Sequence, residues 1–170
     1  MEELLSVKLR PKCINDIIGQ EHLVGRDKII YNLVKNKKLF SMILYGHPGI
    51  GKTSIATAIA EELGMRYRNL NAVVNNKKDF DTVIEEAKLY DGLIVIVDEI
   101  HRLNKNVEEI LYPALEDYTL DIIIGKGPTA RSIRLDLPKF TLIGATTKAG
   151  SLSTPLRDRF GIVHRLELYD

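Results

Sequence analysis

Short, continuously apolar runs recur along the chain and predict buried strands. Three of them, 41–45, 93–97 and 140–145, are rich in Ile, Val and Leu and are bounded by turn or helix signals. Such runs are typical of strands that are covered on both faces of a parallel sheet. A fourth apolar run, 161–168, lies close to the C-terminus and predicts one more strand.

Helical periodicity appears between the apolar runs. Residues 52–63 carry apolar side chains at helical spacing and meet a stop signal at Gly64. Residues 79–90 repeat this pattern, with Asp79 as the expected N-cap. Because strands and helices alternate, we expect right-handed crossovers and a doubly wound α/β fold in which helices flank a parallel sheet.

One region, 120–137, breaks this alternation. Two strand-like runs flank the sequence GKGPTA, and the second run alternates apolar and polar residues. This pattern predicts a β-hairpin inserted just before the strand at 140–145. Two strands alone are marginally stable, so we expect the hairpin to lean on the body of the domain or on a partner.

Length and composition are those of one soluble globular domain, expected over residues 1–170, with 45% hydrophobic and 28% charged residues. The net charge of +1 gives no case for a broadly nucleic-acid-binding surface, so any such contact must be local or supplied elsewhere. The single cysteine, Cys13, excludes an internal disulfide. The N-terminal residues lack an apolar signal core, and no apolar run is long enough for a membrane span, so we expect a cytoplasmic protein.

The sequence GHPGIGKT, residues 46–53, matches the phosphate-binding loop G-x-x-x-x-G-K-[ST] between a predicted strand and a predicted helix. Its glycines let backbone N–H groups point at phosphate oxygens, and the helix N-terminus adds partial positive charge. Lys52 is expected to reach the β- and γ-phosphates of ATP, and Thr53 to ligate Mg²⁺. His47 occupies an unspecified position, and we expect no catalytic role for it. The expected nucleotide-binding residues of the loop are Gly46, Gly49, Ile50, Gly51, Lys52, Thr53 and Ser54.

Two adjacent carboxylates, Asp98 and Glu99, follow the apolar run at 93–97. In a fold of this class, the carboxyl end of a second strand lies beside the phosphate-binding loop. We expect Asp98 to hold the Mg²⁺ shell and Glu99 to orient or deprotonate the attacking water. The plainer interpretation is a solvated strand end, which the nearby phosphate-binding loop disfavours.

The motifs DEIHRLN, GATT and PLRDRFG, which follow the GKT loop, resemble those of AAA+ ATPases. Residues 107–169 closely resemble the RuvB family of Holliday-junction branch-migration motors. The N-terminal half, with IIGQEHLVG and LNAVVNNKKDF, looks more like the RarA/MgsA family of recombination ATPases. The chain therefore resembles a mosaic of the two families. It is a natural recombinant, a divergent relative or an engineered chimera.

This resemblance implies further roles at matching positions. Thr147 would be the sensor-1 residue, with Thr146 as its competitor; the alternative is that both hydroxyls only cap the following turn. Arg159 matches the arginine finger that acts on the ATP of a neighbouring subunit, and Arg157 is the less favoured candidate. A solvated salt bridge is the ordinary alternative for such an arginine. The residues that match adenine and nucleotide contacts of the family are Leu9, Arg10, Ile17, Ile18 and Tyr169.

The resemblance also implies partners. In the RuvB family the ATPase forms hexameric rings, and the matching hairpin contacts RuvA through apolar residues, for which Ile122, Ile124 and Ile133 are the candidates here. Packing of these isoleucines against the body is the alternative. The family's helical lid and winged-helix DNA-binding domain have no counterpart in residues 1–170, so we expect junction DNA to be bound through those additional domains.

Three functions remain open from the sequence. The favoured one is the ATP-hydrolysing core of a RuvB-like branch-migration motor; the others are a RarA-like ATPase at stalled forks and a nucleotide-binding module with negligible turnover. Cys13, His22, His101 and His164 lack the spacing of metal ligands or of a catalytic pair, and we assign them no role.

Overall fold

A five-stranded sheet forms the centre of the molecule in the computed structural model, which describes residues 11–17, 19–160 and 162–166. The strand order is β2-β3-β6-β1-β7, and the paired neighbours run parallel. The strands are β1 (Met42–Tyr45), β2 (Tyr67–Asn71), β3 (Ile94–Asp98), β6 (Thr141–Thr146) and β7 (Ile162–Arg165). The predicted α/β fold with a parallel sheet is thereby confirmed.

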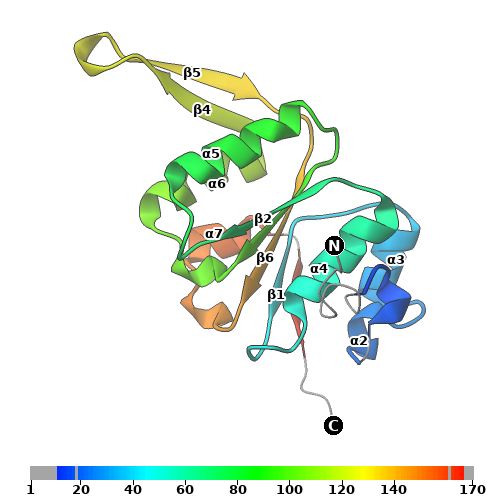
Figure 1. Cartoon of the computed structure of the whole chain (residues 1–170). Helices are drawn as coiled ribbons and strands as arrows, with labels where there is room; N and C mark the ends of the chain where they lie inside the picture. Colours follow the sequence, from blue (N-terminus) through cyan, green and yellow to red (C-terminus); the bar gives the residue numbers. More distant parts are fainter. Residues whose placement is uncertain (1–10, 18, 161, 167–170) are drawn as a thin grey trace, which may run out of the picture.

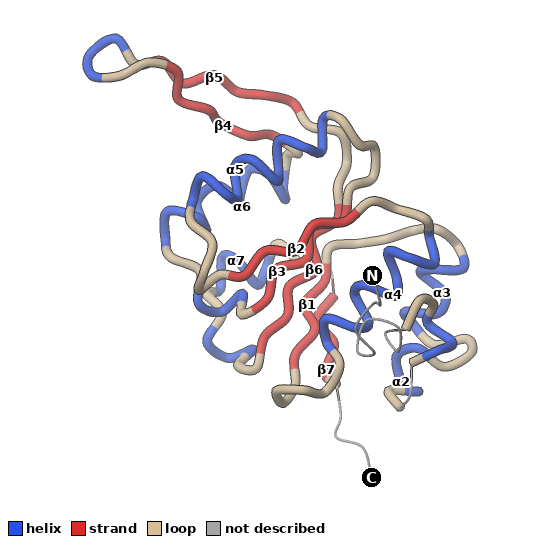
Figure 2. The backbone as a smooth tube through the Cα atoms, viewed as in Figure 1, coloured by secondary structure: helices blue, strands red, loops and turns tan. Residues whose placement is uncertain are grey.

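Helices cover both faces of this sheet (Figures 1 and 2). One face carries η1 (Ile14–Asp16), α2 (Glu21–Val24), α3 (Ile29–Lys35) and α4 (Lys52–Leu63). The other carries α5 (Lys77–Glu85), η2 (Glu86–Lys88), η3 (Ile100–Arg102), α6 (Lys105–Glu116) and α7 (Thr154–Asp158). Strand residues alternate between the two cores, so that Met42 and Leu44 face one and Ile43 the other. Within the described ranges, no helix is both long and apolar enough to cross a membrane.

The helix α4 begins and ends where its periodicity predicts, and α5 does not. Gly64, in the left-handed conformation with φ 64°, terminates α4 at Leu63. The N-cap of α5 is Asn76, whose side chain accepts a hydrogen bond of 3.0 Å from the backbone N–H of Asp79. The Asp79 carboxylate in turn accepts the N–H of Asn76, completing a capping box. Asp79 as N-cap is therefore wrong: it is the third residue of the helix.

The edge strand β2 was not among the predicted strands, because its sequence carries no apolar run. Of Tyr67–Asn71 only Leu70 is fully buried, since the strand has a neighbour on one side alone. Its pairing with β3 places Asn71 directly beside Asp98. The strand thus brings a polar side chain to the edge at which the acidic pair lies.

The predicted hairpin is present and projects from the body of the domain (Figure 1). It consists of β4 (Thr119–Ile124) and β5 (Arg131–Asp136), which pair antiparallel around the short turn η4 (Gly127–Thr129). Only its base packs on the core, through buried Leu120 and partly buried Ile122. Ile124 and Ile133 are exposed, and so is Ile123, which is not among the isoleucines expected to contact a partner.

A buried histidine on β7 links stability to pH. Burial lowers the pKa of His164, and the nearby His22 lowers it further. The unfolded chain therefore binds a proton at higher pH than the folded chain does, and the free energy of unfolding should fall as pH drops below about 6.5. We expect His164→Asn to show a smaller fall than the wild type in urea unfolding at pH 7.5 and 5.5. His47→Asn, at an exposed position, is the control and should follow the wild type.

Candidate functional site

The phosphate-binding loop lies between β1 and α4, at the carboxyl edge of the sheet. Gly51 adopts φ 102°, in the region that favours glycine, and forms the N-cap of α4. A Cβ on Gly46 would lie 3.0 Å from the carbonyl oxygen of Leu166, so a larger residue would fit only if that segment shifted by a few tenths of an ångström. The backbone conformation at Gly51 and the close approach at Gly46 therefore both favour glycine in this loop.

A pocket of about 430 Å³ opens over this loop. Three neighbouring strands contribute polar residues from their carboxyl ends: Asn71 after β2, Asp98 and Glu99 at β3, and Thr147 after β6. Parallel strands deliver their carboxyl ends to one edge, which is why residues far apart in the sequence meet here. The lining residues are Pro48, Gly49, Gly51, Lys52, Thr53, Ser54, Asn71, Asp98, Glu99 and Thr147.

The ammonium group of Lys52 lies across the loop. Its Nζ donates hydrogen bonds to the carbonyl oxygens of Gly46, at 2.9 Å, and His47, at 2.8 Å. Burial lowers its pKa, and the carboxylates of Glu99 and Asp98 oppose that shift. The acidic pair thus helps to keep the lysine positively charged in a partly dehydrated loop.

Thr53 and Asp98 meet at the first turn of α4. The Thr53 hydroxyl donates a hydrogen bond of 2.7 Å to Oδ1 of Asp98. Two hard oxygen atoms converging beside a phosphate-binding loop match Mg²⁺, which takes one or two protein oxygens and keeps several waters. The described residues offer no cluster of three or more His, Cys, Asp or Glu side chains for a metal held by protein alone. The donor set therefore fits a cation that arrives with a nucleotide.

Glu99 adopts a backbone conformation that few non-glycine residues adopt. Its φ of 54° and ψ of 40° are left-handed, and it precedes the short turn η3. Such conformations cost energy and persist where the surrounding structure enforces them. Glu99 lines the pocket, and Nε2 of His101 lies 3.6 Å from its Oε2.

The two threonines at the end of β6 have different surroundings. Thr146 is completely buried, and its Oγ1 lies 2.7 Å from Nδ1 of His101 and accepts the N–H of Lys148. Thr147 lines the pocket beside the acidic pair. This arrangement favours Thr147 over Thr146 as the residue facing a bound nucleotide.

Arg159 lies apart from this pocket, at the C-terminal end of α7. Its guanidinium is 3.2 Å from the Glu116 carboxylate and stacks over the Tyr112 ring at 4.3 Å. It also donates a hydrogen bond to the carbonyl of Pro155. The Arg157 guanidinium donates a hydrogen bond to the carbonyl oxygen of Ala149. Neither arginine is among the residues that line the pocket of its own chain.

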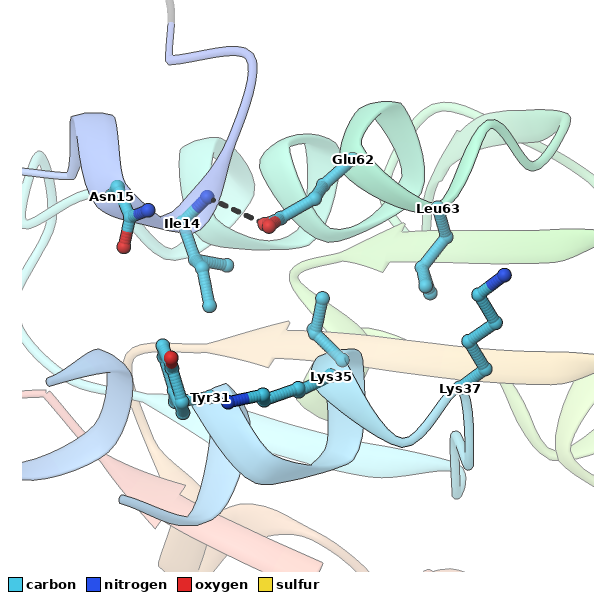
Figure 3. A pocket seen from close by; sticks show the side chains of 8 residues that line it. Ile14, Asn15, Tyr31, Lys35, Lys37, Glu62 and Leu63 are labelled. Atoms are coloured by element: carbon cyan, nitrogen blue, oxygen red, sulfur yellow. Dashed lines mark hydrogen bonds between the residues drawn. The ribbon is translucent and has the colours of Figure 1, made fainter. Parts of the chain in front are cut away.

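Most residues expected around the adenine lie outside the described residues, namely Leu9, Arg10, Ile18 and Tyr169. Ile17 is partly buried against the core beneath α4, and Ile50 is buried in that core. Nearby Ile14 donates its N–H to Glu62 at 2.9 Å and borders a hollow of about 350 Å³ (Figure 3). That hollow lies at the C-terminal end of α4, far from the phosphate-binding loop at its N-terminal end.

Sequence reasoning missed two polar residues of this region, Asn71 and His101. Asn71 follows a strand without an apolar run, so its place beside Asp98 had no local signal. His101 was set aside because it lacks the spacing of a metal ligand, although it directly follows the acidic pair and Ile100 in DEIH. Its proximity to the acidic pair was the available signal.

A strand, loop and helix that cradle phosphate, with an acidic pair on a neighbouring parallel strand, define a P-loop ATPase domain of the AAA+ class. The family model "Holliday junction DNA helicase RuvB P-loop domain" matches residues 9–166. The chain belongs to this family, whose P-loop domain binds nucleotide. One family model thus spans both halves, including the half with the RarA/MgsA resemblance.

Solved structures of Thermotoga maritima RuvB resemble the chain throughout. One is described as the Holliday junction branch migration motor; it is 37% identical with a TM-score of 0.76, over 95% of this chain and 50% of that one. A variant with arginine in place of a lysine is 36% identical with a TM-score of 0.79, over 96% and 50%. The chain therefore spans about half the length of these relatives.

Proposed function

We propose that this chain is the ATP-hydrolysing core of a RuvB-like motor that moves Holliday junctions in recombination and repair. The convergence of Lys52, Thr53, Asp98, Glu99 and Thr147 on one pocket carries the proposal. Family membership over residues 9–166 supports the biological role, because the matched domain is that of a Holliday-junction helicase.

The residues that line the pocket take separate roles in ATP hydrolysis. The backbone N–H groups of the loop and Lys52 bind the β- and γ-phosphates of ATP. Thr53 and Asp98 would hold Mg²⁺, and the bound metal would neutralise charge on the phosphates. Glu99 orients the attacking water and accepts its proton, and Thr147 positions the γ-phosphate or the water.

Nucleotide binding gives the direct test. Lys52→Ala should weaken ATP binding about 10–100-fold, because a hydrogen bond to a charged group contributes roughly 1.5–3 kcal/mol. Isothermal titration calorimetry with ATP and Mg²⁺ measures the effect. Lys105→Ala, at an exposed position at the start of α6, should bind like the wild type. Equal ATP affinity of Lys52→Ala and wild type would contradict the proposal.

Assembly and partners follow from the same proposal. Copies of the chain form a ring in which Arg159 reaches the ATP of a neighbour. The hairpin β4–β5 contacts a RuvA-like protein, which its exposed Ile123, Ile124 and Ile133 support. Junction DNA is contacted through the half of the relatives' length that this chain does not match.

A further inference from the structure

His101 connects the ends of two central strands. It lies in η3, directly after the acidic pair of β3, and only 9% of its side chain is exposed. Its Nδ1 is 2.7 Å from Oγ1 of Thr146, the last residue of β6, and its Nε2 is 3.6 Å from Oε2 of Glu99. One imidazole thus makes a hydrogen bond with a buried hydroxyl on one side and lies within electrostatic reach of the expected catalytic carboxylate on the other.

The neighbours of the ring favour the tautomer with its proton on Nε2. Oγ1 of Thr146 accepts the backbone N–H of Lys148 at 3.0 Å and can donate its own hydrogen to Nδ1 of His101. The Glu99 carboxylate on the other side of the ring favours an N–H at Nε2, which faces it. With the proton on Nε2, the ring accepts the hydrogen of the buried Thr146 hydroxyl and turns an N–H toward the carboxylate. The opposite tautomer would point a lone pair at Glu99.

We propose that His101 is a positioning residue, which holds the Glu99 carboxylate at a fixed place relative to β6. The relay that does so runs from the backbone N–H of Lys148 to the Thr146 hydroxyl, from there to the His101 ring, and from the ring to Glu99. The left-handed backbone of Glu99 requires such support, since a residue with φ 54° keeps this conformation only when its surroundings enforce it. The inference rests on the proposed function, because it assigns Glu99 to hydrolysis.

The position of His101 separates its effect on turnover from any effect on nucleotide binding. Of the described residues, Glu99 and Thr147 line the pocket, and His101 does not. His101→Ala should therefore lower kcat about 10–100-fold, the loss typical when a supporting residue is removed or a reacting group moves by about 1 Å. The Kd for ADP should stay at the wild-type value.

Two conservative variants distinguish positioning of Glu99 from support of Thr146. The amide nitrogen of His101→Gln reaches the place of Nε2 and can donate to Glu99, so most of the lost kcat should return. His101→Asn reaches only the place of Nδ1, so it keeps the contact with Thr146 and should remain as slow as His101→Ala. A merely structural role predicts the reverse order. Adding His101→Ala to Glu99→Gln should cost no further activity, because both act through one carboxylate.

The tests are steady-state hydrolysis, calorimetry with ADP, and long-range ¹H–¹⁵N spectra of the histidine rings. The spectra should show His101 protonated on Nε2, with Nε2 shifted by Glu99→Gln and Nδ1 by Thr146→Val. Three results would each overturn the inference: a wild-type kcat in His101→Ala, full activity of His101→Asn, or an Nε2 signal of His101 that Glu99→Gln leaves unchanged. Absence of hydrolysis in the wild type would instead refute the proposed function, and the ring spectra would still decide whether the relay exists.

Discussion

Glu99→Gln should bind ATP with Mg²⁺ and hydrolyse it about 10²–10⁴-fold more slowly than the wild type, the usual contribution of a general base. Glutamine keeps the size of the side chain and one accepting oxygen but cannot take up a proton. The groups proposed to bind the phosphates and the metal, Lys52, Thr53 and Asp98, are unchanged. Single-turnover hydrolysis of radiolabelled ATP and calorimetric Kd values measure the two effects separately.

Glu109→Gln is the matched control, because Glu109 is exposed on α6 and is not a lining residue of the nucleotide pocket. It should hydrolyse ATP like the wild type. If Glu99→Gln also turned over at the wild-type rate, the assignment of the base would be wrong. If wild type and variant both bound ATP with equally negligible turnover, the chain would be a nucleotide-binding module.

The sequence predicted the parts of the fold that have a local signal. The strands β1, β3 and β6 are buried on both faces and therefore read as continuous apolar runs. The bounds of α4 follow from the loop glycine at one end and Gly64 at the other. These elements alone position the phosphate-binding loop and the acidic pair, so the sequence predicted that both would line one pocket.

What the sequence did not predict depends on tertiary contacts. The edge strand β2 buries only Leu70, so neither an apolar run nor a strict alternation marks it, and Asn71 went unnoticed with it. The preference for Thr147 over Thr146 as the sensor-1 residue depends on the hydrogen bond between the Thr146 hydroxyl and His101. That contact joins residues 45 positions apart, which no local pattern records.

Arg159→Ala should lower turnover about 10³–10⁵-fold, the contribution of an arginine finger to phosphoryl transfer. Within its own chain Arg159 contacts Glu116 and stacks on Tyr112, away from the pocket, so its charge must act elsewhere if it acts in catalysis. Arg157→Ala serves as the control and should lose little activity. If turnover fell strongly in Arg157→Ala and not in Arg159→Ala, Arg157 would be the arginine finger in place of Arg159.

Mixing two inactive variants tests whether the finger works between subunits. In an assembly of Lys52→Ala with Arg159→Ala, each Arg159→Ala subunit keeps an intact phosphate-binding loop, and a Lys52→Ala neighbour supplies an intact Arg159. Activity should therefore return on mixing and rise with total protein concentration, because assembly brings the two halves together. Recovery would also show that Arg159→Ala is folded, despite losing its contacts with α6. A finger that acts within one chain predicts that the mixture stays inactive at every concentration, since no subunit then contains both groups.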